Sequence, residues 1–132
     1  MSTLPAYFQV PPRAWGQPVP HNVRMSAQPD DLLMDLIDRV ARRDEVALKA
    51  LYDLTSSKLY GLSMRVVGKA EWAEDVLQET FLQIWRSAGD YRASLSPPMA
   101  WLGLIVRSRS LDYLRRRSAE RTHHTDEIDD AM

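Results

Sequence analysis

Apolar side chains recur at the spacing of one helix face along most of this chain. The first run predicts a helix over residues 30–42, and its apolar positions are Leu32, Leu33, Leu36, Ile37 and Val40. A second run predicts a helix over residues 45–67, with Asp44 suited to cap its start and Gly68 suited to a left-handed C-terminal cap. The hydroxyl residues at 55–57 compete for backbone hydrogen bonds and predict a bend in its middle.

Two further helices are predicted after Gly68. The third spans residues 70–87 and carries acidic side chains in its first turns, where the helix dipole favours negative charge. The fourth runs from residue 97 to about residue 119, with Ser96 as its cap and Pro97 at its first position. Since neither strand alternation nor an internal repeat is present, we predict an all-α fold, a compact bundle of about four helices.

The remaining segments predict the domain organisation. Residues 1–29 hold six of the eight prolines without a sustained period, which predicts an extended, mostly disordered arm. Residues 30–121 are predicted to form the helical domain, and residues 122–132 the start of an acidic linker. The aromatic side chains of residues 1–29 suggest that this arm can dock on another surface, although a free arm with exposed rings is the simpler interpretation.

Composition excludes several classes of protein. Apolar residues make up 45% and charged residues 27% of the 132, a globular mixture without an apolar run long enough to cross a bilayer. There is no cysteine, which excludes disulfide scaffolds, thiolate zinc sites and cysteine nucleophiles. With no secretory signal pattern at the N-terminus, we expect a soluble, cytoplasmic protein without membrane insertion.

Charge is unevenly distributed although the net charge is only −1. Residues 30–79 hold 11 acidic side chains against 7 basic ones, whereas residues 86–121 hold eight arginines against three acids. Residues 122–132 are acidic again. This separation suggests two partners of different character, one of them a polyanion.

The predicted third helix has an apolar face and a polar face. The apolar face is expected to be core, and its members are Ala73, Val76, Leu77, Thr80, Phe81 and Ile84. The opposite face collects the polar residues Glu71, Asp75, Gln78, Glu79 and Arg86. Leu82 falls in the middle of this polar face, flanked by Trp72 and Trp85, and such an anchor is typical of a protein-docking patch. A solvated face with one exposed leucine is the alternative interpretation.

The predicted fourth helix and the loop before it carry the positive charge. Six arginines cannot all share one stripe of the helix, so several of them are expected to form a broad basic surface at its end. The six are Arg107, Arg109, Arg115, Arg116, Arg117 and Arg121. Three aromatic residues interleave with them, namely Tyr91, Trp101 and Tyr113. Basic side chains together with stacking rings suit single-stranded nucleic acid. The alternative is that the rings are core residues and the arginines only solubilise the chain.

The combination of these patterns resembles a known family. Residues 73–85 read Ala-Glu-Asp-x-x-Gln-Glu-x-Phe-x-x-x-Trp, and about 15 residues later come Trp101-Leu102, Ile105 and Asp112-Tyr113-Leu114-Arg115. This succession resembles region 2 of the extracytoplasmic-function (ECF) group of bacterial sigma factors, over about residues 30–121.

The resemblance implies two binding surfaces and no catalytic chemistry. It implies a surface for the clamp coiled coil of RNA polymerase core, comprising Asp75, Gln78, Glu79, Leu82 and Trp85. It also implies a reader of the minus-ten promoter element, which traps unpaired bases of the non-template strand. Its residues are Tyr91, Arg92, Trp101, Leu104, Arg107, Ser108, Arg115, Arg116 and Arg117. Trp101 would lie near the upstream edge of the melted bubble, and an anti-sigma protein is a further expected partner.

The chain departs from the family pattern at three places. Ser108 stands where the family often has an asparagine, and a hydroxyl only partly replaces an amide at a base edge. The loop over residues 90–96 lacks glycine and is followed by Pro97 and Pro98. In the family a second helical domain reads the minus-35 element, and since only 11 residues follow Arg121 we expect this sequence to represent an isolated region 2 that ends in its linker.

Other classes of function remain as alternatives. A helix-turn-helix repressor would use residues 70–87 as its recognition helix, but four acids and one arginine there disfavour the major groove. His123 and His124 beside acidic residues are weak metal ligands, and no catalytic motif is present. We therefore expect a binding protein that is not an enzyme and that uses no metal or cofactor. A module that only binds an anti-sigma protein is the remaining alternative.

Overall fold

Four α-helices and one short 3₁₀ turn form the part of the chain that the structure describes. The computed structural model describes the backbone of residues 29–131 and the side chains of residues 30–122. The elements, in chain order, are α1 (Pro29–Ala41), α2 (Glu45–Val67), α3 (Ala70–Ser87), η3 (Ala88–Asp90) and α4 (Pro98–Ala131). The predicted all-α bundle is confirmed, since these elements include no strand. The prediction of an N-terminal arm falls on residues 1–28, which lie outside the described part.

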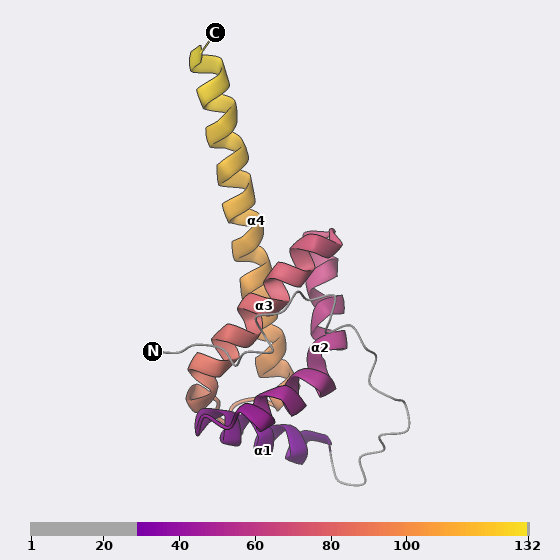
Figure 1. Ribbon diagram of the computed structural model, residues 1–132. Helices are drawn as coiled ribbons and strands as arrows, with labels where there is room; N and C mark the ends of the chain where they lie inside the picture. The colour runs from indigo at the N-terminus through magenta and orange to yellow at the C-terminus, as the bar shows by residue number, and fades with distance from the viewer. Residues whose placement is uncertain (1–28, 132) are drawn as a thin grey trace.

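The predicted caps of α2 are present. The Asp44 carboxylate accepts hydrogen bonds from the backbone N–H groups of Val46 and Ala47. Gly68 ends the helix at φ 75°, the left-handed conformation that glycine adopts without steric cost. The hydroxyl of Thr55 donates to the carbonyl of Leu51 at 2.7 Å, and α2 changes direction part-way along its length (Figure 1).

The core lies where α2, α3 and α4 pack against one another, with α1 covering one end of the bundle (Figure 1). The apolar face predicted for α3 is buried, and Phe81 at its centre meets the ring of Tyr52 edge-on at 4.9 Å. On α4, Leu102 and Val106 are completely buried. Serines at the α2–α4 contact allow close approach, and the hydroxyl of Ser110 donates to that of Ser63 at 3.1 Å. This packing holds one face of α3 and one face of α4 toward solvent.

The fourth helix differs from its predicted bounds at both ends. It begins at Pro98, because the carbonyl of Pro97 accepts the first helical hydrogen bond, from the N–H of Trp101 at 3.1 Å. Pro98 therefore fills the position where a missing N–H costs nothing. The helix continues to Ala131, beyond the predicted end at about residue 119, and its last turns extend past the other helices (Figure 1). Residues 104–131 contain neither glycine nor proline, so nothing in the backbone chemistry ends the helix where its apolar periodicity fades.

Within residues 29–131, every helix is too short or too polar to span a lipid bilayer.

Candidate functional site

The polar face of α3 is positioned as predicted, apart from one residue. Asp75 is exposed, while Gln78, Glu79 and Leu82 are half-buried. Leu82 therefore keeps part of its side chain accessible among polar neighbours, although less of it than a free anchor would have. An apolar group surrounded by polar groups is the arrangement that protein interfaces use for affinity and register.

Trp85 was predicted on this face, and that prediction is wrong. Its side chain is only 6% exposed and belongs to the core. Arg43, in the turn between α1 and α2, covers the indole at 5.1 Å and donates a hydrogen bond to the Trp85 carbonyl. Arg43 has φ 67°, and its guanidinium meets one of the carbonyls left open at the C-terminal end of α3. Trp85 thus fixes the end of the helix and is not available to a partner.

Acidic residues of α3 are paired with residues of α4. The hydroxyl of Tyr113 donates to the Asp75 carboxylate at 2.7 Å. A terminal nitrogen of Arg116 lies 2.8 Å from both carboxylate oxygens of Glu79. Arg117 in turn donates to the Tyr113 hydroxyl at 2.9 Å. We call this group the α3–α4 seam, and its members are Trp72, Asp75, Glu79, Tyr113, Arg116 and Arg117.

Cation–π contacts complete the seam. The ring of Trp72 carries the Lys69 ammonium at 4.4 Å and the Arg117 guanidinium at 5.6 Å, and the ring of Tyr113 lies 6.0 Å away. Burial is the largest cause that raises the pKa of Tyr113, so its hydroxyl remains protonated and able to donate at neutral pH. The hydrogen bond to Glu79 raises the pKa of Arg116.

The seam joins residues that the sequence assigned to two separate binding surfaces. Asp75 and Glu79 were assigned to one surface, and Arg116 and Arg117 to the other, yet these groups contact each other. The acidic face of α3 and the basic part of α4 therefore adjoin along one edge of the bundle. Of the three successive arginines, Arg115 is exposed and has no hydrogen bond or ion pair with any described residue.

The loop between η3 and α4 is held in a defined conformation. The N–H groups of Leu95 and Ser96 both donate to the Arg92 carbonyl, at 3.0 and 3.4 Å. The hydroxyl of Tyr91 donates across the loop to the Ser96 carbonyl at 2.8 Å. The Tyr91 ring also packs on Trp101 of α4, with ring centroids 5.2 Å apart. Trp101 therefore supports the loop from inside, while Arg92 is exposed on its outer side.

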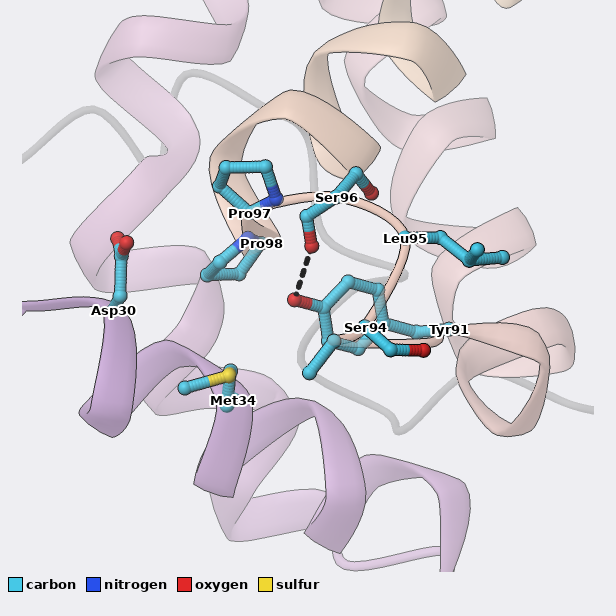
Figure 2. A pocket seen from close by; sticks show the side chains of 9 residues that line it. Asp30, Met34, Tyr91, Ser94, Leu95, Ser96, Pro97 and Pro98 are labelled. Carbon is cyan, nitrogen blue, oxygen red and sulfur yellow. Dashed lines mark hydrogen bonds between the residues drawn. The ribbon is translucent and has the colours of Figure 1, made fainter.

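A pocket of about 350 Å³ opens between this loop and the start of α1, and we call it the loop pocket (Figure 2). Such a volume lies at the lower end of the range for small-molecule sites. Its lining residues are Asp30, Met34, Tyr91, Ala93, Ser94, Leu95, Ser96, Pro97 and Pro98. Figure 2 shows that α1 supplies one side and the loop supplies the other, with the Tyr91–Ser96 hydrogen bond crossing the loop side.

The outward face of α4 carries a continuous exposed stripe. Leu104 is 64% exposed, and Leu111, two turns further on, is 40% exposed. The other exposed members of the stripe are Arg107, Ser108 and Arg115. By contrast, Arg109 is half-buried, and its Nε has no hydrogen-bond partner among the described atoms.

Three residues of these surfaces were not predicted. Leu111 lies seven positions after Leu104, so a helical projection of α4 would have found it. Asp30 and Met34 line the loop pocket because α1 meets a loop about 60 residues further along the chain. No local sequence pattern indicates a contact between segments so far apart.

The described side chains include no group of three or more potential ligands placed to hold a metal ion. The side chains of His123 and His124 lie outside that part of the chain. Together the bundle, the seam and the loop pocket define a helical domain with adjoining acidic and basic surfaces and a pocket beside the start of α1.

Comparison with known protein families identifies the family to which this domain belongs. A sequence profile of the family described as Sigma-70 region 2 matches residues 51–120, which is more than half of the chain. The chain belongs to this family. The match includes the polar face of α3, the loop and the exposed stripe of α4, and the resemblance to region 2 of the ECF sigma factors is confirmed. The helix-turn-helix repressor is thereby not favoured.

Several similar proteins come from mycobacteria. The chain is 42% identical over 84 residues to the ECF RNA polymerase sigma factor SigK of Mycobacterium sp. strain KMS, covering 64% of this chain and 44% of that protein. It is 37% identical over 89 residues to the ECF RNA polymerase sigma factor SigK of Mycobacterium ulcerans strain Agy99, covering 67% and 48%. For the protein of the same name from Mycobacterium tuberculosis strain H37Ra the identity is 35% over 96 residues, covering 73% and 49%. The chain spans about half the length of the curated relatives it matches.

Proposed function

We propose that this chain acts in transcription initiation as region 2 of a sigma factor. In this proposal α3 attaches the domain to the clamp coiled coil of RNA polymerase core. The loop over residues 91–97 and α4 hold unpaired bases of the non-template strand at the minus-ten element. The domain works by binding alone, in the cytoplasm with the polymerase, and favours melting because its affinity for unpaired DNA exceeds that for duplex. The printed names of the relatives, ECF RNA polymerase sigma factor, support this role.

The observation that carries the proposal is the loop pocket at the start of α4, the helix that also carries the exposed stripe. Trp101 and Ser96 fix the Tyr91 ring, so one wall of the pocket is formed before any ligand arrives. A base that is stacked in duplex DNA exposes no face to such a pocket, whereas an unpaired base does. Exposure of Arg107 and Ser108 on α4 supports their assignment to the part of the strand outside the pocket.

The polar face of α3 supports the protein-binding half of the proposal. Leu82 offers an apolar anchor, and Gln78 beside it offers both donor and acceptor groups. Asp75 and Glu79 are already oriented by their hydrogen bonds to α4. Oriented side chains lose less conformational entropy on docking, so this acidic face is preorganised to bind a basic partner surface.

Exposure of Leu104 and Leu111 favours a second partner on α4. Nucleic acid alone does not explain two leucines that are 64% and 40% exposed and lie two turns apart on one stripe. We assign this stripe also to an anti-sigma protein, which would cover it and so exclude DNA. Competition between such a protein and DNA for the domain tests this assignment.

Co-purification with core polymerase, combined with titration of single-stranded and duplex DNA, tests the main proposal. The full chain is expected to bind core polymerase and, in that assembly, to prefer single strands. Binding to duplex DNA without core polymerase would instead indicate a repressor. Binding to neither DNA nor core polymerase would leave only the interaction module.

A further inference from the structure

The two sides of the loop pocket differ in chemistry. The loop side presents pyrrolidine rings, a tyrosine ring and the serine hydroxyls, whereas the α1 side presents the Asp30 carboxylate and the Met34 thioether (Figure 2). Asp30 is exposed, and no described residue forms a hydrogen bond or ion pair with it. Among the lining residues, Asp30 is therefore the one charged acceptor, and it has no partner in the part of the chain that the structure describes.

We propose that Asp30 makes the loop pocket selective for a base that carries an exocyclic amino group, so that thymine is the base it rejects. This inference rests on the proposed function, because it takes the ligand of the pocket to be an unpaired base. It adds a residue of α1 to a recognition element otherwise formed by the loop and α4.

The selectivity follows from the hydrogen-bonding groups of the bases. An ionised carboxylate accepts hydrogen bonds and donates none. Cytosine, adenine and guanine each carry an amino group that donates to it, and carboxylates are established partners of the cytosine amino group. Thymine has no amino group, and two carbonyl oxygens flank its single ring N–H, so its approach to Asp30 sets oxygen against oxygen.

The loop side is rigid enough to make this selection effective. Pro97 and Pro98 have a fixed φ, and the turn is closed by the hydrogen bonds to the Arg92 carbonyl. Burial raises the pKa of Tyr91 and the charge of Asp30 adds to this effect, so the phenol keeps the proton that it donates to Ser96. A base that enters the pocket therefore meets a preformed wall on the loop side, and the only charged acceptor among the lining residues, the Asp30 carboxylate, lies on the α1 side.

The charge of Asp30 also repels the phosphate groups of DNA, whatever the base sequence. Replacing it is therefore expected to raise the affinity for all DNA slightly, which would obscure a change in base preference. Asp31 provides the matched control, because it is also exposed in the first turn of α1 but does not line the pocket. The variants Asp30→Asn and Asp31→Asn change the charge equally, and only the first changes the pocket.

The test is a selection from single-stranded DNA with a randomised central segment, bound to the full chain assembled with core polymerase. The wild-type assembly is expected to deplete thymine about fivefold or more at one position of the bound strands, since a good contact to a base edge discriminates by at least that factor. Asp30→Asn is expected to abolish this depletion, because an amide donates to the thymine carbonyl. Asp31→Asn is expected to retain it.

The outcomes separate this inference from the proposed function. If the wild-type assembly selects no sequence at all, the proposed function fails. If it selects a sequence and Asp30→Asn leaves every base preference unchanged, the role of Asp30 is overturned and the function stands. Equal effects of Asp30→Asn and Asp31→Asn would also overturn it, because they would show a general charge effect only.

Discussion

Thr80 places a hydroxyl oxygen in the core of the bundle where it has no hydrogen-bond partner among the described atoms. A buried hydroxyl that lost its water without gaining a partner lowers stability. Thr55 is also buried, but its hydroxyl donates to the Leu51 carbonyl at 2.7 Å. The two threonines therefore form a natural comparison within one core.

Thr80→Val is expected to raise the free energy of unfolding by about 1 kcal/mol, because it replaces the unpaired hydroxyl with a methyl group of similar size. Thr55→Val serves as the control and is expected to stabilise less, because it removes a satisfied hydrogen bond. Chemical denaturation followed by circular dichroism measures both changes. Equal gains from the two variants would show that the hydroxyl of Thr80 is not the cause.

Glu79 holds Arg116, which the proposed function assigns to DNA. Glu79→Gln is expected to raise the affinity of the assembly for single-stranded DNA about two- to threefold, because an exposed ion pair of this kind contributes well under 1 kcal/mol and its loss leaves Arg116 only the longer ion pair with Asp112 at 3.5 Å. Glu71→Gln, an equal change of charge on an exposed residue of α3, is the control. Identical increases from both variants would mean that Arg116 is not restrained by the pair.

At the scale of single elements, the cap of α2 links stability to pH. Hydrogen bonds from the backbone N–H of Ala47 and from the Arg39 side chain lower the pKa of Asp44 below its ordinary value of 3.8. A carboxyl group whose pKa is lower in the folded state stabilises the fold above its ordinary pKa, and loses this effect as the pH falls through the folded value.

Asp44→Asn keeps an oxygen acceptor at the cap but removes the titration. Between about pH 5 and pH 2 the stability of the wild type is therefore expected to fall more steeply than that of the variant. Thermal melting across this range gives the comparison. Parallel curves for the two proteins would show that the Asp44 charge contributes nothing to the cap.

The polar face of α3 depends on Leu82. Leu82→Asp is expected to abolish association with core polymerase while the helical content stays unchanged, because the residue is only half-buried and a charge at the centre of an interface is not compensated. Val46→Asp, on an exposed position of α2, is the control and is expected to bind normally. Normal binding by Leu82→Asp would remove α3 from the proposed polymerase contact.

The elements also show how far the sequence could be interpreted. The bounds of α2 and α3 and the caps at Asp44 and Gly68 followed from local pattern, because helix periodicity and capping are local effects. Burial of Trp85 and the pairing of Glu79 with Arg116 could not be predicted, since they depend on Arg43 and on the crossing of α3 with α4. The end of α4 was placed too early because fading periodicity was taken for the loss of the helix itself.

At the scale of the whole molecule, the arginines after Leu114 are unequal. All three are exposed, but Arg116 and Arg117 are engaged in the seam, whereas the Arg115 side chain has no partner within the described part of the chain. Arg115→Ala is expected to flatten the dependence of log affinity on log salt by about 0.7 for single-stranded DNA, the value for one phosphate contact. Arg65→Ala, an exposed residue of the last turn of α2, is the control. An unchanged slope in Arg115→Ala would place this residue away from the strand.

A single helix connects the two ends of the proposed DNA surface. Trp101, which supports the loop pocket, and Arg115 both belong to α4. At 1.5 Å per residue their backbones lie about 21 Å apart, a length equal to about six nucleotides of a stacked strand. Under the proposed function, α4 therefore sets the spacing between the trapped base and the bound phosphate, and a nucleotide inserted or deleted between them is expected to weaken binding.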